Sequence, residues 1–196
     1  MKRSKEKITL SILLAAVLVV GIVGYMIYVQ RQFYTESTKN LLETYEQVDK
    51  TFTMFAQRNW NVLSEWGSNL QDDADGEAVR ASLCLFNRQK PTWKYSGLYL
   101  FNEDCTYLDA ESGHGSAKHI WGAFSEMYIT GLPCVGSYTM KNGERRVVFT
   151  VPIEPVKVDG ETYTCIAVSY DNETLEEMIG GHAYNGQSDC YIIYPS

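Results

Sequence analysis

The sequence lacks the short motifs that mark common active sites. It contains no Gly-x-Ser-x-Gly, no His-Glu-x-x-His and no Gly-x-x-x-x-Gly-Lys segment. Of its three histidines, His114 and His119 are too far apart for a helical metal pair, no carboxylate joins them at ligand spacing, and His182 stands alone. We therefore expect no catalytic residues, no metal site and no cofactor in this chain.

Cysteine is scarce and shows no zinc or redox spacing. Five widely separated cysteines allow at most two disulfides, so at least one thiol stays free or pairs between chains. Buried free thiols are an equally good interpretation. The five are Cys84, Cys105, Cys134, Cys165 and Cys190.

The sequence has fewer basic than acidic residues, and its net charge is −7. The first 30 residues carry four Lys or Arg and one Glu, a net charge of +3, which leaves −10 for the rest of the chain. An acidic surface excludes nucleic acid as an expected partner and suits a solvated extracytoplasmic module.

Charge is absent altogether from Ile8 to Val29, a run of about 22 mostly apolar residues. As a helix it spans a hydrocarbon core of roughly 30 Å, so we predict a transmembrane helix over residues 8–30. The basic residues in the tail 1–7 predict that this tail is cytoplasmic and that the remainder lies outside the cell membrane after one crossing. A cleaved signal peptide is the alternative, but the run is long and ends in large side chains.

Neither glycine nor proline interrupts the chain between Phe33 and Trp66. Apolar residues there follow an alternating 4–3 spacing, which predicts one long stalk helix over residues 31–71 that continues the membrane helix. The stripe fits a signalling stalk that pairs in a parallel homodimer, and it equally fits a helix that packs on its own domain. The stripe comprises Tyr34, Leu41, Tyr45, Val48, Phe52, Phe55, Val62 and Trp66.

The rest of the chain alternates strand, helix and turn signals. Asn142-Gly143 and Asp159-Gly160 predict two-residue type I′ turns between neighbouring strands. The order predicts an α+β fold, a five-stranded antiparallel sheet with helices on one side. We expect helices over residues 77–86, 117–129 (capped by Ser116) and 173–179, a loop at 90–92, and strands over 95–101, 106–109, 135–140, 145–153 and 162–170, with a further strand at 188–194.

Three segments resemble the Cache family of extracytoplasmic PAS-like sensor domains. Residues 97–104 (GLYLFNED) are similar to the family's first hairpin, residues 147–153 (VVFTVPI) to its strand ending in x-Pro-Val, and residues 166–171 (IAVSYD) before Leu175 to its closing strand and helix. The resemblance covers about residues 31–196. It implies a PAS-like sensor module over residues 72–185 and places the first strand of a truncated second module, of the double-Cache type, at residues 186–196.

The resemblance also implies a function. Such domains bind small ligands outside the cell and belong to larger receptors, so the chain is expected to be the N-terminal sensor part of a histidine kinase in a two-component system. A diguanylate cyclase or a chemoreceptor is the alternative output, and a non-sensing envelope interaction protein is the alternative from another class.

The two predicted turns fix which residues share a face of the sheet. With two-residue loops, Thr139 opposes Arg146 and Thr150 opposes Ser169. That places small polar groups beside Arg146, with Asp171 just past the closing strand. Such a row either lines a cavity for a small polar ligand, with Arg146 taking a carboxylate and Asp171 an ammonium group, or is simply solvated.

Aromatic residues on the preceding helix complete the expected site. Trp121, Phe124 and Tyr128 recur at helical spacing, which is typical of core packing but also suits a helix that roofs a ligand pocket. In amino-acid-binding Cache receptors an aspartate at the place of Asp171 holds the ligand's amine, whereas their Arg-x-Trp-Tyr motif has only His119-Ile120-Trp121-Gly122 as its match here. The expected ligand is a small polar molecule, with amino acids and amines as the candidate classes. The candidate ligand-binding residues are Trp121, Tyr128, Thr139, Arg146, Ser169 and Asp171.

Overall fold

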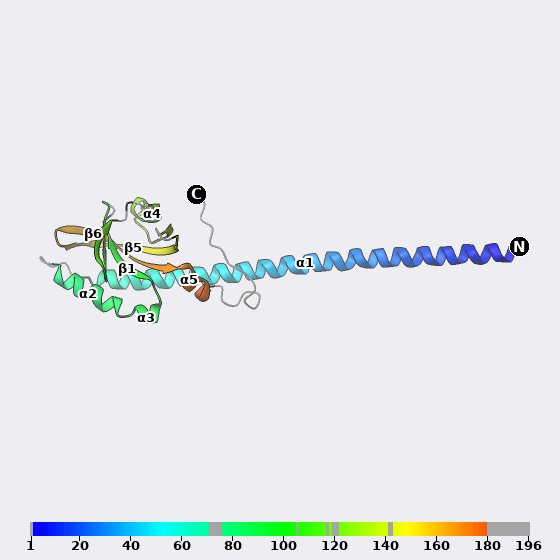
Figure 1. Cartoon of the computed structure of the whole chain (residues 1–196), viewed down its shortest axis with the longest axis horizontal. Coiled ribbons are helices and arrows are strands. Elements are labelled where there is room, and N and C mark those ends of the chain that lie inside the picture. The colour runs from blue at the N-terminus through cyan, green and yellow to red at the C-terminus, as the bar shows by residue number, and fades with distance from the viewer. Residues whose placement is uncertain are drawn as a thin grey trace. The chain divides into compact units, whose positions relative to one another are not determined.

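The chain forms an α+β structure in which one very long helix precedes an antiparallel sheet (Figure 1). The computed structural model describes residues 2–70, 76–104, 106–116, 118, 122–140 and 143–179, with side chains from Leu13 onward. The elements are α1 (Lys2–Ser68), α2 (Glu77–Asn87), α3 (Lys90–Trp93), β1 (Gly97–Phe101), β2 (Thr106–Asp109), β3 (Gly113–Ser116), α4 (Gly122–Thr130), β4 (Cys134–Thr139), β5 (Arg145–Val158), β6 (Glu161–Asp171) and α5 (Asn172–Ile179).

Helix α1 is continuous from Lys2 to Ser68, as the absence of helix breakers predicted. Its apolar N-terminal part is long enough to cross a membrane by length and composition, with a mean hydropathy of 2.2 and none of that stretch buried. The chain divides into two units, Met1–Gln47 and Val48–Ser196. All described residues of the first unit belong to α1, and the second unit contains the sheet.

The sheet has six strands in the order β3-β2-β1-β6-β5-β4, all paired antiparallel. The α+β class is confirmed, but the predicted strand number was one too low. The additional strand is β3, where Ser116 pairs with Thr106 instead of capping a helix. Its glycines hid it from the strand pattern, because a residue without a side chain contributes no alternation.

The hairpin between β4 and β5 differs from the predicted two-residue turn. The Met140 amide donates to the Glu144 carbonyl oxygen at 2.7 Å, and Gly143, at φ 86°, donates back to the Met140 carbonyl oxygen at 2.9 Å. The loop therefore has three residues, a length that favours a left-handed glycine at its end. The register shifts by one, so Arg146 lies opposite Tyr138 and not opposite Thr139.

The hairpin between β5 and β6 begins as predicted and then changes register. Asp159 and Gly160 both have positive φ, and Val158 opposes Glu161, as a type I′ turn requires. An irregularity between Pro152 and Val156 then gives β5 two more residues than β6. Side chains along a strand alternate with a period of two. Each residue of β5 before the irregularity therefore points to the predicted side of the sheet, but it pairs with a β6 residue two positions away from the predicted one. Arg146 consequently lies directly opposite Asp171.

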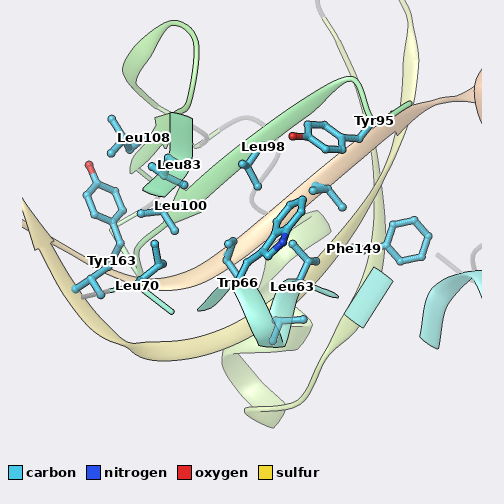
Figure 2. Close-up of a cluster of buried hydrophobic side chains, with 14 of the residues drawn as sticks. Leu63, Trp66, Leu70, Leu83, Tyr95, Leu98, Leu100, Leu108, Phe149 and Tyr163 are labelled. Atoms are coloured by element: carbon cyan, nitrogen blue, oxygen red, sulfur yellow. The ribbon is translucent and has the colours of Figure 1, made fainter. Parts of the chain in front are cut away.

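One face of the sheet packs on the C-terminal part of α1 and on α2. Leu63 and Trp66 of α1 point toward Leu98 and Leu100 of β1, and Leu63 is 1% exposed (Figure 2). The Trp66 ring stacks on Phe86 of α2 with 4.9 Å between centroids. Each fully buried leucine contributes about 1.5–3 kcal/mol, so these contacts fix α1 against the sheet. Val156, Val158 and Tyr163 extend the same core beyond the irregularity in β5.

The opposite face of the sheet packs on α4, so helices cover both sides and not one side as predicted (Figure 1). Phe124 of α4 lies on Phe101 with 4.0 Å between ring centroids. A Cβ at Gly136 of β4 would overlap the Ala123 carbonyl oxygen, so the backbones of α4 and β4 approach closely here. We call this side the α4 face; its buried residues include Phe101, Val148, Cys165 and Ala167.

The remaining elements follow the predicted order. The predicted loop at residues 90–92 is instead the short helix α3, with Pro91 in its first turn, where proline is well tolerated. The predicted helix over 117–129 is described from Gly122 and ends at Thr130. The strand expected at 188–194, and with it the proposed second module, lies outside the described residues.

Candidate functional site

Three tyrosines gather on the α4 face beside the cluster around Phe124. Tyr99 of β1, Tyr107 of β2 and Tyr138 of β4 are all half-buried and pack against that cluster. Tyr99 and Tyr107 meet edge to face with 5.6 Å between ring centroids. Strand alternation brings them to this side, since Tyr99 opposes Ala167 and Phe101 opposes Tyr107.

Two glycines make room for these rings. A Cβ at Gly97 would overlap the hydroxyl end of Tyr99, and a Cβ at Gly115 would overlap the ring of Tyr107. The Tyr99 ring therefore lies along β1 over Gly97, and the Tyr107 ring lies across to β3 over its partner residue Gly115. Glycine within a strand often marks such a close approach, and here it holds the tyrosines against the sheet.

The hydroxyls of Tyr99 and Tyr138 approach a serine in the middle of the face. Ser169 of β6 is fully buried, and its Oγ donates to the Tyr99 Oη at 3.5 Å. Burial, followed by the electrostatic effect of Tyr99, raises the pKa of Tyr138 to about 12. Burial also raises the pKa of Tyr107. The Tyr107 and Tyr138 hydroxyls therefore stay protonated at physiological pH and can each donate one hydrogen bond.

Arg146 is the cation of this face. Its side chain is 18% exposed, and its Nε donates to the Glu144 Oε1 at 2.8 Å. Burial is the largest single effect and opposes the charged form, but the hydrogen bond to Glu144 and the electrostatic effects of Tyr138, Tyr99 and Glu144 together raise the pKa of Arg146. Among the described residues only Glu144 accepts a hydrogen bond from Arg146, which leaves the two terminal guanidinium nitrogens as donors for a ligand.

Asp171 lies opposite Arg146 but is engaged elsewhere. Its Oδ1 accepts from the Thr174 amide at 2.7 Å, so it caps the N-terminus of α5, and its Oδ2 accepts from the Ser96 hydroxyl at 2.9 Å. Burial opposes ionisation, yet the hydrogen bonds from Thr174 and Ser96 hold the pKa of Asp171 below its usual value. A carboxylate has about four acceptor positions, so Asp171 keeps little capacity for a ligand's ammonium group.

The structure brings together four of the six predicted site residues. Arg146, Ser169 and Asp171 lie on adjacent strands, and Tyr128 of α4 packs with Tyr138 at the same cluster. The predicted facing of Thr139 is wrong: it opposes Arg145, is exposed, and so lies on the opposite face from Arg146. Trp121 lies outside the described residues.

Sequence reasoning missed the three tyrosines as a group. A two-residue turn at Asn142-Gly143 would place Tyr138 on the face opposite to Arg146, so the predicted turn hid its place in this group. For Tyr99 and Tyr107, the pairing of each strand tyrosine with a nearby strand glycine was the available signal. The distance along the chain between β1, β2 and β4 concealed that they meet.

Similar structures exist although sequence comparison finds none. No family model matches the chain, and no curated protein is similar to it in sequence. The sensory domain of the Campylobacter jejuni chemoreceptor Tlp3, crystallised with isoleucine, matches 74% of this chain and 64% of its own, with a TM-score of 0.55 and 14% identity. The ligand-binding domain of the Pseudomonas aeruginosa PAO1 amino acid chemoreceptor PctB, in complex with L-Arg, matches 74% and 57% with a TM-score of 0.55 and 15% identity.

These matches show the fold. The chain shares the α+β fold of these chemoreceptor sensory and ligand-binding domains, the fold class that the sequence resemblance implies. The chain spans about three fifths of the length of those domains.

Proposed function

We propose that this chain is the extracytoplasmic small-ligand sensing part of a membrane-bound signalling receptor. The observation that carries the proposal is a half-buried Arg146, whose terminal guanidinium nitrogens donate to no described residue, beside Tyr99, Tyr138 and Ser169. Such a group of donors on an aromatic wall suits one small polar molecule with an anionic end. The apolar start of α1 and the fold of the sheet support the membrane-bound, extracytoplasmic context.

For the ligand we propose an amino acid or a related small carboxylate. Its carboxylate binds the terminal nitrogens of Arg146 between Tyr99 and Tyr138, and its apolar part rests on the tyrosine rings. The ammonium group meets the one acceptor position that Asp171 has left, with Ser169 nearby. The chemoreceptor domains with the same fold bind isoleucine in one case and L-Arg in another, which supports this ligand class.

The test is a ligand screen on the full chain in lipid nanodiscs, using amino acids, organic acids and amines in a thermal-shift assay. For any hit, Arg146→Gln should lower affinity by about 10- to 100-fold, the value of a charge-assisted hydrogen bond. Arg145→Gln is the matched control, because Arg145 is exposed on the other face, opposite Thr139. Silence across the library, or equal losses in both variants, would contradict the proposal and favour a structural role at the envelope.

For the output we propose a histidine kinase encoded beyond residue 196. The proposal is supported by the family resemblance and by the basic residues before the apolar stretch, which predict a cytoplasmic N-terminus. Reading the gene past this codon tests it. A chemoreceptor signalling module or a diguanylate cyclase there would overturn the choice of output and leave the sensing proposal unaffected.

A further inference from the structure

Four side chains from four elements form a hydrogen-bonded network away from the tyrosines. The Nδ1 of His114, on β3, lies 2.8 Å from the Oη of Tyr163 on β6. Its Nε2 lies 2.8 Å from the Oδ2 of Asp159, in the turn between β5 and β6. Arg80 of α2 also donates to Asp159. The imidazole therefore connects the edge strand of the sheet to a helix, a turn and a central strand.

The two imidazole contacts are both satisfied by one neutral tautomer. Asp159 has its pKa lowered by its hydrogen bonds with His114 and Arg80, so it is a carboxylate and can only accept, from Nε2–H. Nδ1 then carries no hydrogen and accepts from the Tyr163 hydroxyl. Burial, followed by Glu161 and Asp159, raises the pKa of Tyr163 to about 12, so this hydroxyl keeps its proton.

Proton uptake by the imidazole reverses its hydrogen bond with Tyr163. A protonated Nδ1–H can only donate to the Tyr163 Oη, so the Tyr163 O–H turns away and loses its acceptor. Tyr163 is fully buried, and among the described residues its hydroxyl has no other acceptor, so this loss is costly. Protonation also strengthens the attraction between His114 and Asp159, but only slightly, because both side chains are about half-exposed. In addition, Arg80 already neutralises Asp159, and the Arg80 Nη2 lies 3.3 Å from the His114 Nε2. The other charged group near the network, Glu161, acts on Tyr163.

Strand β3 is held by its pairing with β2 and by this network. It has four residues, is the outermost strand, and pairs only with β2. Its Gly115 lies under the Tyr107 ring of the candidate site, which in turn contacts Tyr99. A movement of β3 would therefore change the contact between Gly115 and the Tyr107 ring and so affect the tyrosines.

We propose that Arg80, His114, Asp159 and Tyr163 form a proton-sensitive latch that holds β3 to the body of the domain while His114 is neutral and releases it when His114 takes up a proton. Histidine is the side chain that ordinarily changes charge between pH 5 and 8. The latch gives the sensor a response to acidification of its surroundings, and it is independent of whether the tyrosine face binds a ligand.

Amide hydrogen exchange on the full chain in nanodiscs, at pH 7.5 and 5.5 and corrected for intrinsic exchange rates, tests the latch without any ligand. We expect the protection of the β2–β3 peptide to fall about tenfold at the lower pH, while the β5–β6 peptides change little. His114→Gln should abolish the pH dependence. Tyr163→Phe should abolish or reverse it, since only the attraction to Asp159 then responds to the proton.

The control is the double variant His119→Gln, His182→Gln, which keeps His114 and should respond like the unaltered chain. Protection that does not change with pH, or that rises on acidification in the unaltered chain, would overturn the proposal. So would a pH dependence that survives in His114→Gln.

Discussion

At the scale of single residues, Asp171 is a candidate ligand-binding residue whose carboxylate already caps a helix. The closing strand ends on it, and its carboxylate takes the Thr174 amide and the Ser96 hydroxyl. Aspartate is a favoured N-cap because its oxygen satisfies an amide that the helix leaves unpaired. The family resemblance gave Asp171 a ligand role, and the structure adds a capping role that limits it.

Replacing Asp171 separates these two roles. Asp171→Ala should destabilise the chain by about 0.5–2 kcal/mol, the usual value of an N-cap, whereas Asp171→Ser keeps a capping oxygen and should cost little. Chemical denaturation of the full chain in detergent, followed by tryptophan fluorescence, measures both. If serine costs as much as alanine, the cap is not what Asp171 contributes. If serine preserves stability but removes ligand affinity, both roles stand.

The lowered pKa of Asp171 also predicts a pH dependence with a definite sign. A carboxyl whose pKa is lower in the folded state stabilises the fold above its unfolded value, near 3.9, and this contribution is lost as pH falls through the folded value. The difference in unfolding free energy between the unaltered chain and Asp171→Asn should therefore shrink between pH 5 and pH 3. A difference that stays constant or grows on acidification would contradict this assignment.

At the scale of elements, α4 is held where a glycine removes a side chain. Gly136 lets the Ala123 carbonyl oxygen of α4 rest directly on β4, and Phe124 then reaches Phe101. At this contact between α4 and β4, backbone packs on backbone. No side chain can rotate away to make room for an added group. The position of α4 beside the tyrosines depends on it.

Gly136→Ala should therefore push α4 away from β4 and destabilise the chain by about 1–3 kcal/mol, the usual cost of overpacking. Gly122→Ala is the matched control, since a Cβ at this first residue of α4 meets no atom within 4 Å and should change stability by less than about 0.5 kcal/mol. Thermal unfolding of the two variants side by side tests this. Equal stabilities would show that α4 does not press on β4.

Sequence reasoning succeeded for elements whose signals are local. The type I′ turn at Asp159-Gly160, the helix of residues 77–87 and the closing strand each depend on neighbouring residues, and all three are observed. The prediction of which β4 side chains point to each face was wrong, because Asn142-Gly143 suits loops of two or three residues. A change of one residue in the loop length moves every β4 side chain to the other face. The register of β6 against β5 at Arg146 depends on an irregularity that no local pattern marks.

At the scale of the whole molecule, α1 presents apolar side chains that its own chain leaves exposed. Tyr34, Leu41 and Tyr45 are 76%, 59% and 68% exposed, whereas Phe52 and Phe55 further along pack on the sheet. The two interpretations of the stripe thus apply to different parts of it. We propose that the exposed part pairs with the same part of a second, parallel copy, since both copies are anchored in one direction.

Crosslinking in membranes tests this pairing. In a background without the five native cysteines, a cysteine at Leu41 should crosslink far better than one at Glu43, which points away from the stripe by two helix positions. Tyrosine at seam positions is bulky and polar at its tip, so the pairing is expected to be weak, as a switch requires. Equal yields at the two positions would show that the stripe serves only its own domain.

The register irregularity in β5 has a consequence for how this domain can change length over evolutionary time. Between Pro152 and Val156 the strand already carries two residues that its partner lacks. Gaining or losing a pair of residues there would leave Arg146 and Val147 facing as they do now, because strand parity repeats every two positions. A single inserted residue would exchange them, placing a guanidinium in the core and a valine among the tyrosines. Viable descendants should therefore differ by even numbers of residues at this point.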